Sequence, residues 1–161
     1  MKNTKTAFAT GLVLNLLFVF GCASPGPKFS DVRKDVPAIR AGQSRVFAYR
    51  TSVLGAAIQP EVRLNGMVIG TARPNVVTFI DVQPGTYQMA TTTEKTNEVS
   101  FTLVAGETKY LKLVPYMGFL IGHIDPQVMK ETEGEEDIRD LALVIAPQMK
   151  GKVPATLLPK E

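Results

Sequence analysis

Turn signals recur about every ten residues along most of this chain, and they constrain its fold more than any other feature. Between them lie short stretches in which apolar and polar residues alternate, as in half-buried β-strands. The clearest signal is Asn65-Gly66, which favours a two-residue type I′ hairpin over residues 61–70, because both turn positions accept a positive φ. This register pairs Leu64 with Met67 and Val62 with Ile69, and it puts all four side chains on one face.

The same reasoning predicts strands over residues 44–51, 76–82, 86–92, 98–104, 109–114 and 118–124. Pro84-Gly85 favours a type II turn, which twists the wrong way for a tight hairpin, so we expect a corner between two sheets there. An acidic run predicts a short helix over residues 133–140, and residues 141–145 are a last strand or a helix end. The predicted fold is all-β: a single antiparallel sandwich of about seven or eight short strands, with a short helical segment near the C-terminus.

The first 21 residues have the anatomy of a secretory signal. Lys2 and Lys5 form a charged start, an apolar segment runs to Phe20, and the small residue Gly21 precedes Cys22. As a helix the apolar segment would span roughly 21 Å, which is short of the ~30 Å hydrocarbon core. A cleaved leader is therefore favoured over a permanent transmembrane helix.

The stretch Val19-Phe20-Gly21-Cys22 has the spacing of a lipobox, with Cys22 as the only cysteine of the chain. We predict signal cleavage between Gly21 and Cys22 and covalent lipidation of the Cys22 thiol. Two or more acyl chains anchor a protein stably, so the expected partner is a membrane, reached through this N-terminal lipid. Ala23 and Ser24 follow, which indicates the periplasmic face of the outer membrane if the host has two membranes.

Composition excludes several functions for the mature chain. The 18 basic residues against 15 acidic ones include Lys2 and Lys5 of the leader, so the remainder is nearly neutral and no nucleic-acid partner is expected. With Cys22 lipidated, no thiol is left for redox or metal chemistry. We expect no cofactor beyond the covalent lipid, and no metal.

The predicted domain organisation has four parts. Residues 1–21 are the signal peptide, and residues 22–43 are a lipidated N-terminus with a flexible tether spanning roughly 25 Å. Residues 44–146 are the sandwich domain, and residues 147–161 are a C-terminal tail broken by prolines.

Six segments in this order resemble a family of bacterial lipoproteins built on a domain of unknown function: "RVFAYR" (45–50), the "GAA" loop (55–57), "VRLNGMVIG" (62–70), "VQPGTYQM" (82–89), "LVAGETKYLKL" (103–113) and "GFLIG" (118–122). The sequence departs from the usual form at Thr51, Asn65, Gln83 and Lys109. The segment at 82–89 also resembles PEGA-type and transthyretin-like sandwiches. The resemblance implies a fold and an envelope location, and it brings no activity and no catalytic residue.

The only histidine, His123, lies two residues before Asp125, so a hydrolase could pair them with a serine. No GxSxG elbow is present, and a structural histidine is the favoured interpretation, so we assign no catalytic residue. The acidic residues of 131–140 lack the alternation and central glycine of a calcium loop, which favours a solvated acidic face.

The apolar strip at 116–124 has two interpretations. It is either a strand covered on both faces, which is favoured, or an exposed binding surface that includes Phe119, Leu120, Ile121 and His123.

Four arginines, Arg45, Arg50, Arg63 and Arg73, form an anionic-ligand patch only if they gather, and scattered surface arginines are the default. The favoured function is a non-enzymatic binding or scaffolding module for an envelope protein or the cell wall. The alternative is a lipid or small-hydrophobe binder that uses the 116–124 strip.

Overall fold

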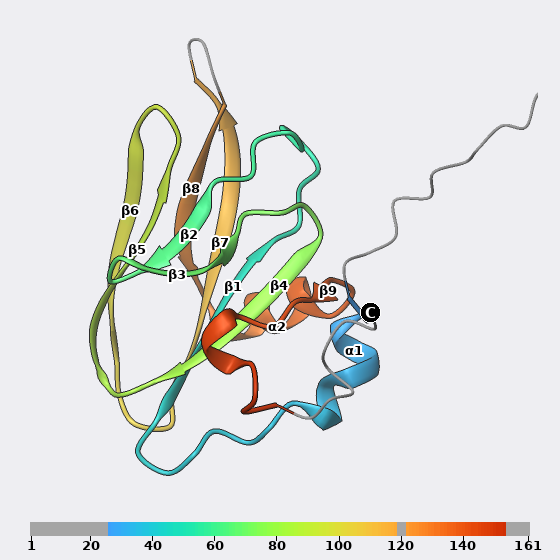
Figure 1. Ribbon diagram of the computed structural model, residues 1–161, viewed down its shortest axis with the longest axis vertical. Helices are drawn as coiled ribbons and strands as arrows, with labels where there is room; N and C mark the ends of the chain where they lie inside the picture. Colours follow the sequence, from blue (N-terminus) through green and yellow to red (C-terminus); the bar gives the residue numbers. More distant parts are fainter. Residues whose placement is uncertain (1–25, 119–121, 154–161) are drawn as a thin grey trace, which may run out of the picture.

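The computed structural model describes residues 26–118 and 122–153, which form two β-sheets and several short helical segments (Figure 1). In chain order the elements are α1 (Phe29–Val32), the 3-10 turn η1 (Arg33–Asp35), β1 (Ser44–Arg50), β2 (Glu61–Leu64), β3 (Met67–Thr71), β4 (Val76–Val82), β5 (Gly85–Thr92), β6 (Thr96–Leu103), β7 (Thr108–Met117), β8 (Gly122–Met129), α2 (Glu131–Ile138), β9 (Ala142–Leu143) and η2 (Pro147–Met149). The predicted all-β sandwich with a short helix near the C-terminus is confirmed.

One sheet has the strand order β8-β7-β1-β4-β9, and the other has the order β3-β2-β5-β6. The Pro84-Gly85 turn joins β4 of the first sheet to β5 of the second, so the predicted corner is confirmed. The first sheet is mixed, because β1 pairs with β7 and β4 pairs with β9 in parallel. The sequence predicted only antiparallel neighbours, so the parallel pairs β1–β7 and β4–β9 were not predicted.

Strand β1 lies at the centre of the five-stranded sheet, and all seven of its residues are buried. Side chains alternate between the two faces of a strand. Phe47 and Tyr49 point to the outer face of the sheet, where Phe29 of α1 and Asp137 of α2 contact them. The opposite face carries Val46 and packs into the sandwich. The helical layer therefore explains why β1 is buried on both sides.

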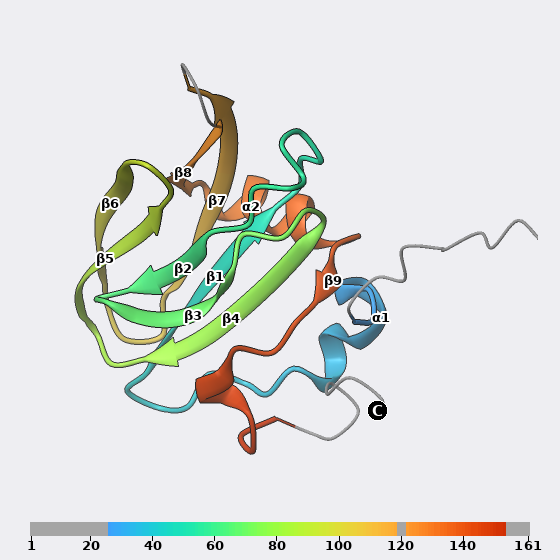
Figure 2. The ribbon, with the colours of Figure 1, turned by 45° about the horizontal axis from the view of Figure 1, so that its top comes forward.

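The N-terminal segment forms part of this outer layer, and the tether predicted over residues 22–43 is wrong for its described part. Phe29 and Val32 are spaced three apart on one helical turn and are both buried. The Phe29 amide donates to the Leu141 carbonyl at 2.8 Å, and the Leu143 amide donates to the Pro27 carbonyl at 2.8 Å. Figures 1 and 2 both place α1 beside β9. The burial of Phe29 and Val32 therefore fixes this segment to the domain, although its prolines and charged residues suggested a flexible coil.

Of the strand predicted over residues 118–124, residues 122–124 belong to β8, and residues 119–121 lie outside the described residues. Strand β8 does not stop at Asp125, and it pairs with β7 as a long antiparallel hairpin in which β7 extends to Met117 and β8 begins at Gly122. Pro115 and Pro126 lie inside these strands and do not end them. Proline is tolerated because β8 is an edge strand, and because Pro115 lies beyond the part of β7 that pairs with β1.

The Asn65-Gly66 hairpin is confirmed at its turn. Asn65 and Gly66 have φ values of 47° and 79°, and Leu64 pairs with Met67 as predicted. A bulge between Val62 and Arg63 then pairs Val62 with Gly70 instead of Ile69. Met67 is 41% exposed, so the expected apolar face contains only three buried members.

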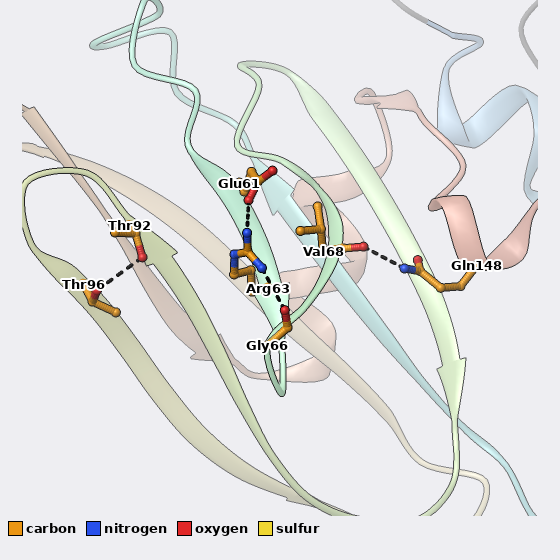
Figure 3. A network of polar contacts seen from close by, with 7 residues as sticks. All are labelled: Glu61, Arg63, Gly66, Val68, Thr92, Thr96 and Gln148. Carbon is orange, nitrogen blue, oxygen red and sulfur yellow. Dashed lines mark hydrogen bonds and ion pairs between the residues drawn. The ribbon is translucent and has the colours of Figure 1, made fainter.

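Polar contacts hold the outer side of this hairpin (Figure 3). Arg63 binds the Glu61 carboxylate and donates to the Gly66 carbonyl at 2.9 Å. Gln148 of η2 donates to the Val68 carbonyl at 2.7 Å, which covers part of the open edge of β3. An edge that is capped in this way is protected against pairing with another chain.

Helix α2 and strand β9 agree with the predicted bounds within two residues, whereas the tail predicted over residues 147–161 is packed at its start, where Met149 of η2 is buried. Helix α2 covers residues 131–138 where 133–140 was predicted, a difference ordinary for helix ends. Strand β9 lies within residues 141–145, which selects the strand over the helix end.

Candidate binding surfaces

Arg50 organises the loop that follows β1. Its side chain is fully buried, and its guanidinium donates to five backbone carbonyls, those of Ser52, Leu54, Gly55, Ile58 and Ala72. Burial lowers the pKa of Arg50. No carboxylate of the described residues pairs with this charge. Five carbonyl dipoles therefore solvate a buried cation and fix the loop over residues 51–60.

The fixed loop presents two exposed apolar side chains, Val53 and Leu54, which are 64% and 54% exposed. It lies against the β7–β8 tip, where an added Cβ on Gly122 would meet the Ile58 side chain at 2.5 Å. At that tip Met117 is 73% exposed and Tyr116 is 38% exposed. We call Val53, Leu54, Tyr116 and Met117 the apolar tip.

Three polar side chains hold the base of β8. Thr91 and Asn97 both donate to the Ile124 carbonyl, at 2.6 Å and 3.1 Å, and Tyr116 donates to the Asn97 side chain at 3.1 Å. These contacts join β8 to the edge of the four-stranded sheet. The tip therefore stands on a rigid base.

His123 lies at this base. Its Nδ1 is 2.7 Å from the Thr93 hydroxyl, and its ring packs against Tyr116 at 5.3 Å between centroids. The Asp125 carboxylate instead accepts from Gln127 at 3.1 Å. Within residues 26–118 and 122–153, no serine or carboxylate is hydrogen-bonded to His123. The hydrolase arrangement considered from the sequence is not assembled there.

The remaining predicted site residues lie outside the described residues. These are Gly21 and Cys22 of the lipidation signal, and Phe119, Leu120 and Ile121 of the alternative binding surface. Among the described residues, no helix has both the length and the apolar content to cross a membrane.

The acidic run on α2 makes ion pairs. Asp137 accepts from the Tyr49 hydroxyl at 2.9 Å and from Lys112 at 2.8 Å, and Glu135 accepts from Arg33 at 3.0 Å. Burial, together with the Asp137 hydrogen bond, raises the pKa of Tyr49. The described residues contain no group of three or more side chains suited to a metal ion. The prediction of a merely solvated face is therefore wrong for Asp137, which helps to attach α2 to the sheet.

The four arginines do not gather, and the default that they lie on the surface is wrong for two of them. Arg45 is buried, forms two hydrogen bonds with Asp81 at 2.6 Å and 2.8 Å, and lies 4.5 Å above the Phe79 ring centroid. Arg50 is buried as described above. Neither role was predicted from the sequence. The only signal for them in the sequence is that the two arginines flank the apolar residues of a strand that lies at the centre of its sheet.

These features define a small β-sandwich with a helical layer on one face and an apolar tip. Residues 40–122 match the family model described as "Protein of unknown function (DUF2846)", and the chain belongs to this family. It is also similar to an uncharacterized protein of Haemophilus influenzae, with 20% identity over 147 residues that cover 88% of each chain. The predicted resemblance to a family built on a domain of unknown function is confirmed in that part.

Proposed function

We propose that this protein is a lipid-anchored envelope lipoprotein, and that its β-sandwich is a non-enzymatic module that binds another envelope protein. The lipobox at Cys22 supports the anchor. The apolar tip carries the binding role, because the loop over residues 51–60 and the end of β7 expose large apolar side chains beside a base that buried polar contacts hold. Such a surface is typical of interaction sites.

The position of the tip favours a protein partner over the anchoring membrane. The chain is docked from Pro27 onward, so Cys22 lies at most about 17 Å from the docked segment. In Figures 1 and 2 the paired ends of β7 and β8 lie at the top of the molecule, away from α1. A domain held near the membrane through α1 therefore directs its tip into the envelope space.

The anchor is tested separately from the binding role. We expect incorporation of a labelled palmitate analogue into the protein in cells, and loss of both the label and membrane fractionation in Cys22→Ala. A Cys22→Ala protein that keeps either property would contradict lipidation at this residue.

The binding role is tested by photo-crosslinking in intact cells, with a photoreactive amino acid placed at Met117. The matched control is the same amino acid at Thr102, an exposed polar position on β6. We expect discrete protein adducts from position 117, none from position 102, and loss of the adducts in Cys22→Ala. Equal labelling from both positions would refute a specific tip interface. Adducts to lipid alone would favour the alternative, a lipid or small-hydrophobe binder.

A further inference from the structure

A cavity of about 280 Å³ lies between the outer face of the five-stranded sheet and the N-terminal segment. It is distinct from the apolar tip, and its walls come from α1, the segment at 36–39, β1, β7 and α2. Its volume is at the lower end of the range of about 300–1,000 Å³ that is typical of ligand pockets. An occupant would therefore be a small molecule.

Three aromatic rings form the apolar wall of this cavity. Phe47 stacks on Tyr110 with centroids 5.2 Å apart and an interplanar angle of 11°, and Phe29 meets Phe47 edge-on at 5.5 Å. Gly134 lets α2 pack directly on the Tyr110 ring, because a Cβ there would overlap the ring carbons. The wall is thus flat and fixed in place, which suits a ring or a short compact apolar group.

Two buried polar side chains on the wall have hydrogen-bonding capacity that the described residues do not use. Arg45 and Tyr110 are 6% and 5% exposed. Arg45 engages Asp81 and the Pro37 carbonyl through Nε and Nη2, and no described residue accepts from Nη1. None bonds to the Tyr110 hydroxyl either. Burial and nearby Glu135 raise the pKa of Tyr110 to about 12, so this hydroxyl is a donor at neutral pH.

The charges that line the cavity are balanced in pairs. Arg33 is paired with Glu135 at 3.0 Å, and Arg45 is paired with Asp81 at 2.6 Å. Both carboxylates are thus engaged, whereas donor groups remain. A ligand that supplies an acceptor oxygen would accept from these two donors, which no described residue occupies.

We infer that this cavity binds a small molecule with a compact apolar body and one acceptor oxygen group, a carboxylate or a carbonyl. The apolar body packs on Phe47 and Tyr110, and the oxygen accepts from the Tyr110 hydroxyl and Arg45 Nη1. This inference is independent of the proposed tip interface, because the two sites share no residue.

The test uses the full chain in lipid nanodiscs with isotope-labelled isoleucine δ1 methyl groups. Ile39 and Ile138 line the cavity, and Ile69, which is buried elsewhere in the core, is the internal control. The probes are benzoate, benzamide and benzylamine. We expect saturable methyl shifts at residues 39 and 138 with benzoate and benzamide, an unchanged Ile69 signal, and no saturable shift with benzylamine.

Tyr110→Phe removes only the hydroxyl and should weaken benzoate binding about five-fold, the loss expected for one hydrogen bond. The matched control is Tyr87→Phe, whose hydroxyl donates to the Gln83 carbonyl outside the cavity. A melting curve of each variant verifies folding. No saturable shift with any probe would overturn the site. Equal binding of benzylamine, or unchanged benzoate affinity in Tyr110→Phe, would overturn the acceptor-oxygen class.

Discussion

Replacing Arg50 by lysine tests whether one buried guanidinium fixes the loop beneath the apolar tip. Arginine has five N–H donors, and in this protein they serve five backbone carbonyls, whereas lysine has three donors. At least two carbonyls therefore lose their donor. Each hydrogen bond to a charged group contributes about 1.5–3 kcal/mol.

Two such losses amount to about 3–6 kcal/mol, and we expect the lower end for Arg50→Lys, about 3 kcal/mol. The reason is that the Ser52, Leu54 and Gly55 carbonyls belong to residues that are not buried, so water replaces part of the loss. The Ala72 carbonyl, by contrast, belongs to a fully buried residue. Arg50→Met removes every donor and should cost more than the lysine variant.

The measurement is urea unfolding followed by circular dichroism, with limited proteolysis of the loop at 51–60 as a local readout. Arg63→Lys is the matched control, because Arg63 lies on the exposed side of the hairpin and contacts one carboxylate and one carbonyl. Exposed pairs of this kind contribute about 0–1 kcal/mol. If Arg50→Lys costs no more than Arg63→Lys and leaves the loop resistant to protease, the role assigned to Arg50 is refuted.

Three further perturbations test other parts of the fold. Gly134→Ala should lower the free energy of unfolding by about 1–3 kcal/mol in a thermal melt, because the new methyl group overlaps Tyr110. This loss should exceed the gain from the higher helix propensity of alanine. A neutral or stabilising result would contradict the packing of α2 on Tyr110. The hydrogen bond with Lys109, and then the one from the Val104 amide, lower the pKa of the Glu107 carboxyl. The ionised carboxylate therefore stabilises the folded state by about 0.5–1 kcal/mol above pH 4.5, and this contribution is lost as the pH falls through the lowered pKa. Glu107→Gln should therefore be less stable at pH 7 and equal to wild type in acid, and a pH-independent difference would refute the linkage. Because the pKa of Tyr110 is raised to about 12, the folded state keeps this proton between pH 10 and 12 while the unfolded state releases it, so stability falls as the pH rises through that window. Tyr110→Phe should reduce this slope in urea unfolding curves, and an unchanged slope would argue against it.

Local turn chemistry was enough to predict much of the sandwich. Asn65-Gly66 specifies its backbone conformation within two residues, so the hairpin turn followed from sequence alone. The corner at Pro84-Gly85 also followed, but the predicted type II turn is wrong, because Gly85 has a φ of 156° and a type II turn needs about +80° there. The bulge at Val62 and Arg63 did not follow, because neither residue differs from an ordinary strand residue.

The errors arose where distant segments determine burial. The apolar composition of residues 118–124 suggested a covered strand, whereas β7 and β8 pair as a hairpin at one edge of the five-stranded sheet, and Met117 at the end of β7 is 73% exposed. Likewise, prolines and charges suggested a tether at 22–43, whereas Phe29 packs against Phe47 of β1 and its amide donates to the Leu141 carbonyl next to β9. The periodicity of apolar residues within one segment does not reveal which distant segments pack against it.

The candidate sites were predicted less well, and Arg45 and Arg50 show why. In the sequence both look like ordinary charged residues that flank a strand. Arginine is rarely buried unless its charge is paired, and the sequence does not show which groups accept from these two side chains. The acceptors of Arg50 are backbone carbonyls of the loop and of Ala72. Every residue has a backbone carbonyl, so the pattern of side chains does not predict these contacts. The Arg45 partner Asp81 lies on β4, directly across from it in the register of the assembled sheet.

Docking of the N-terminal segment connects the two proposals of anchoring and ligand binding. The residues that fix the chain to β9 begin at Pro27, a few residues after the proposed lipidation site at Cys22, and Phe29 also forms a wall of the cavity. A long flexible tether would let the domain rotate freely above the bilayer, whereas a short segment that ends in a packed helix restricts which face approaches the membrane. The cavity lies in the helical layer beside α1, and Figures 1 and 2 show the paired ends of β7 and β8 at the top of the molecule, away from α1. Under the proposed lipid anchor, the segment that leads to the membrane also covers the proposed ligand site, so a small molecule would be bound near the membrane while the tip remains available to a protein partner.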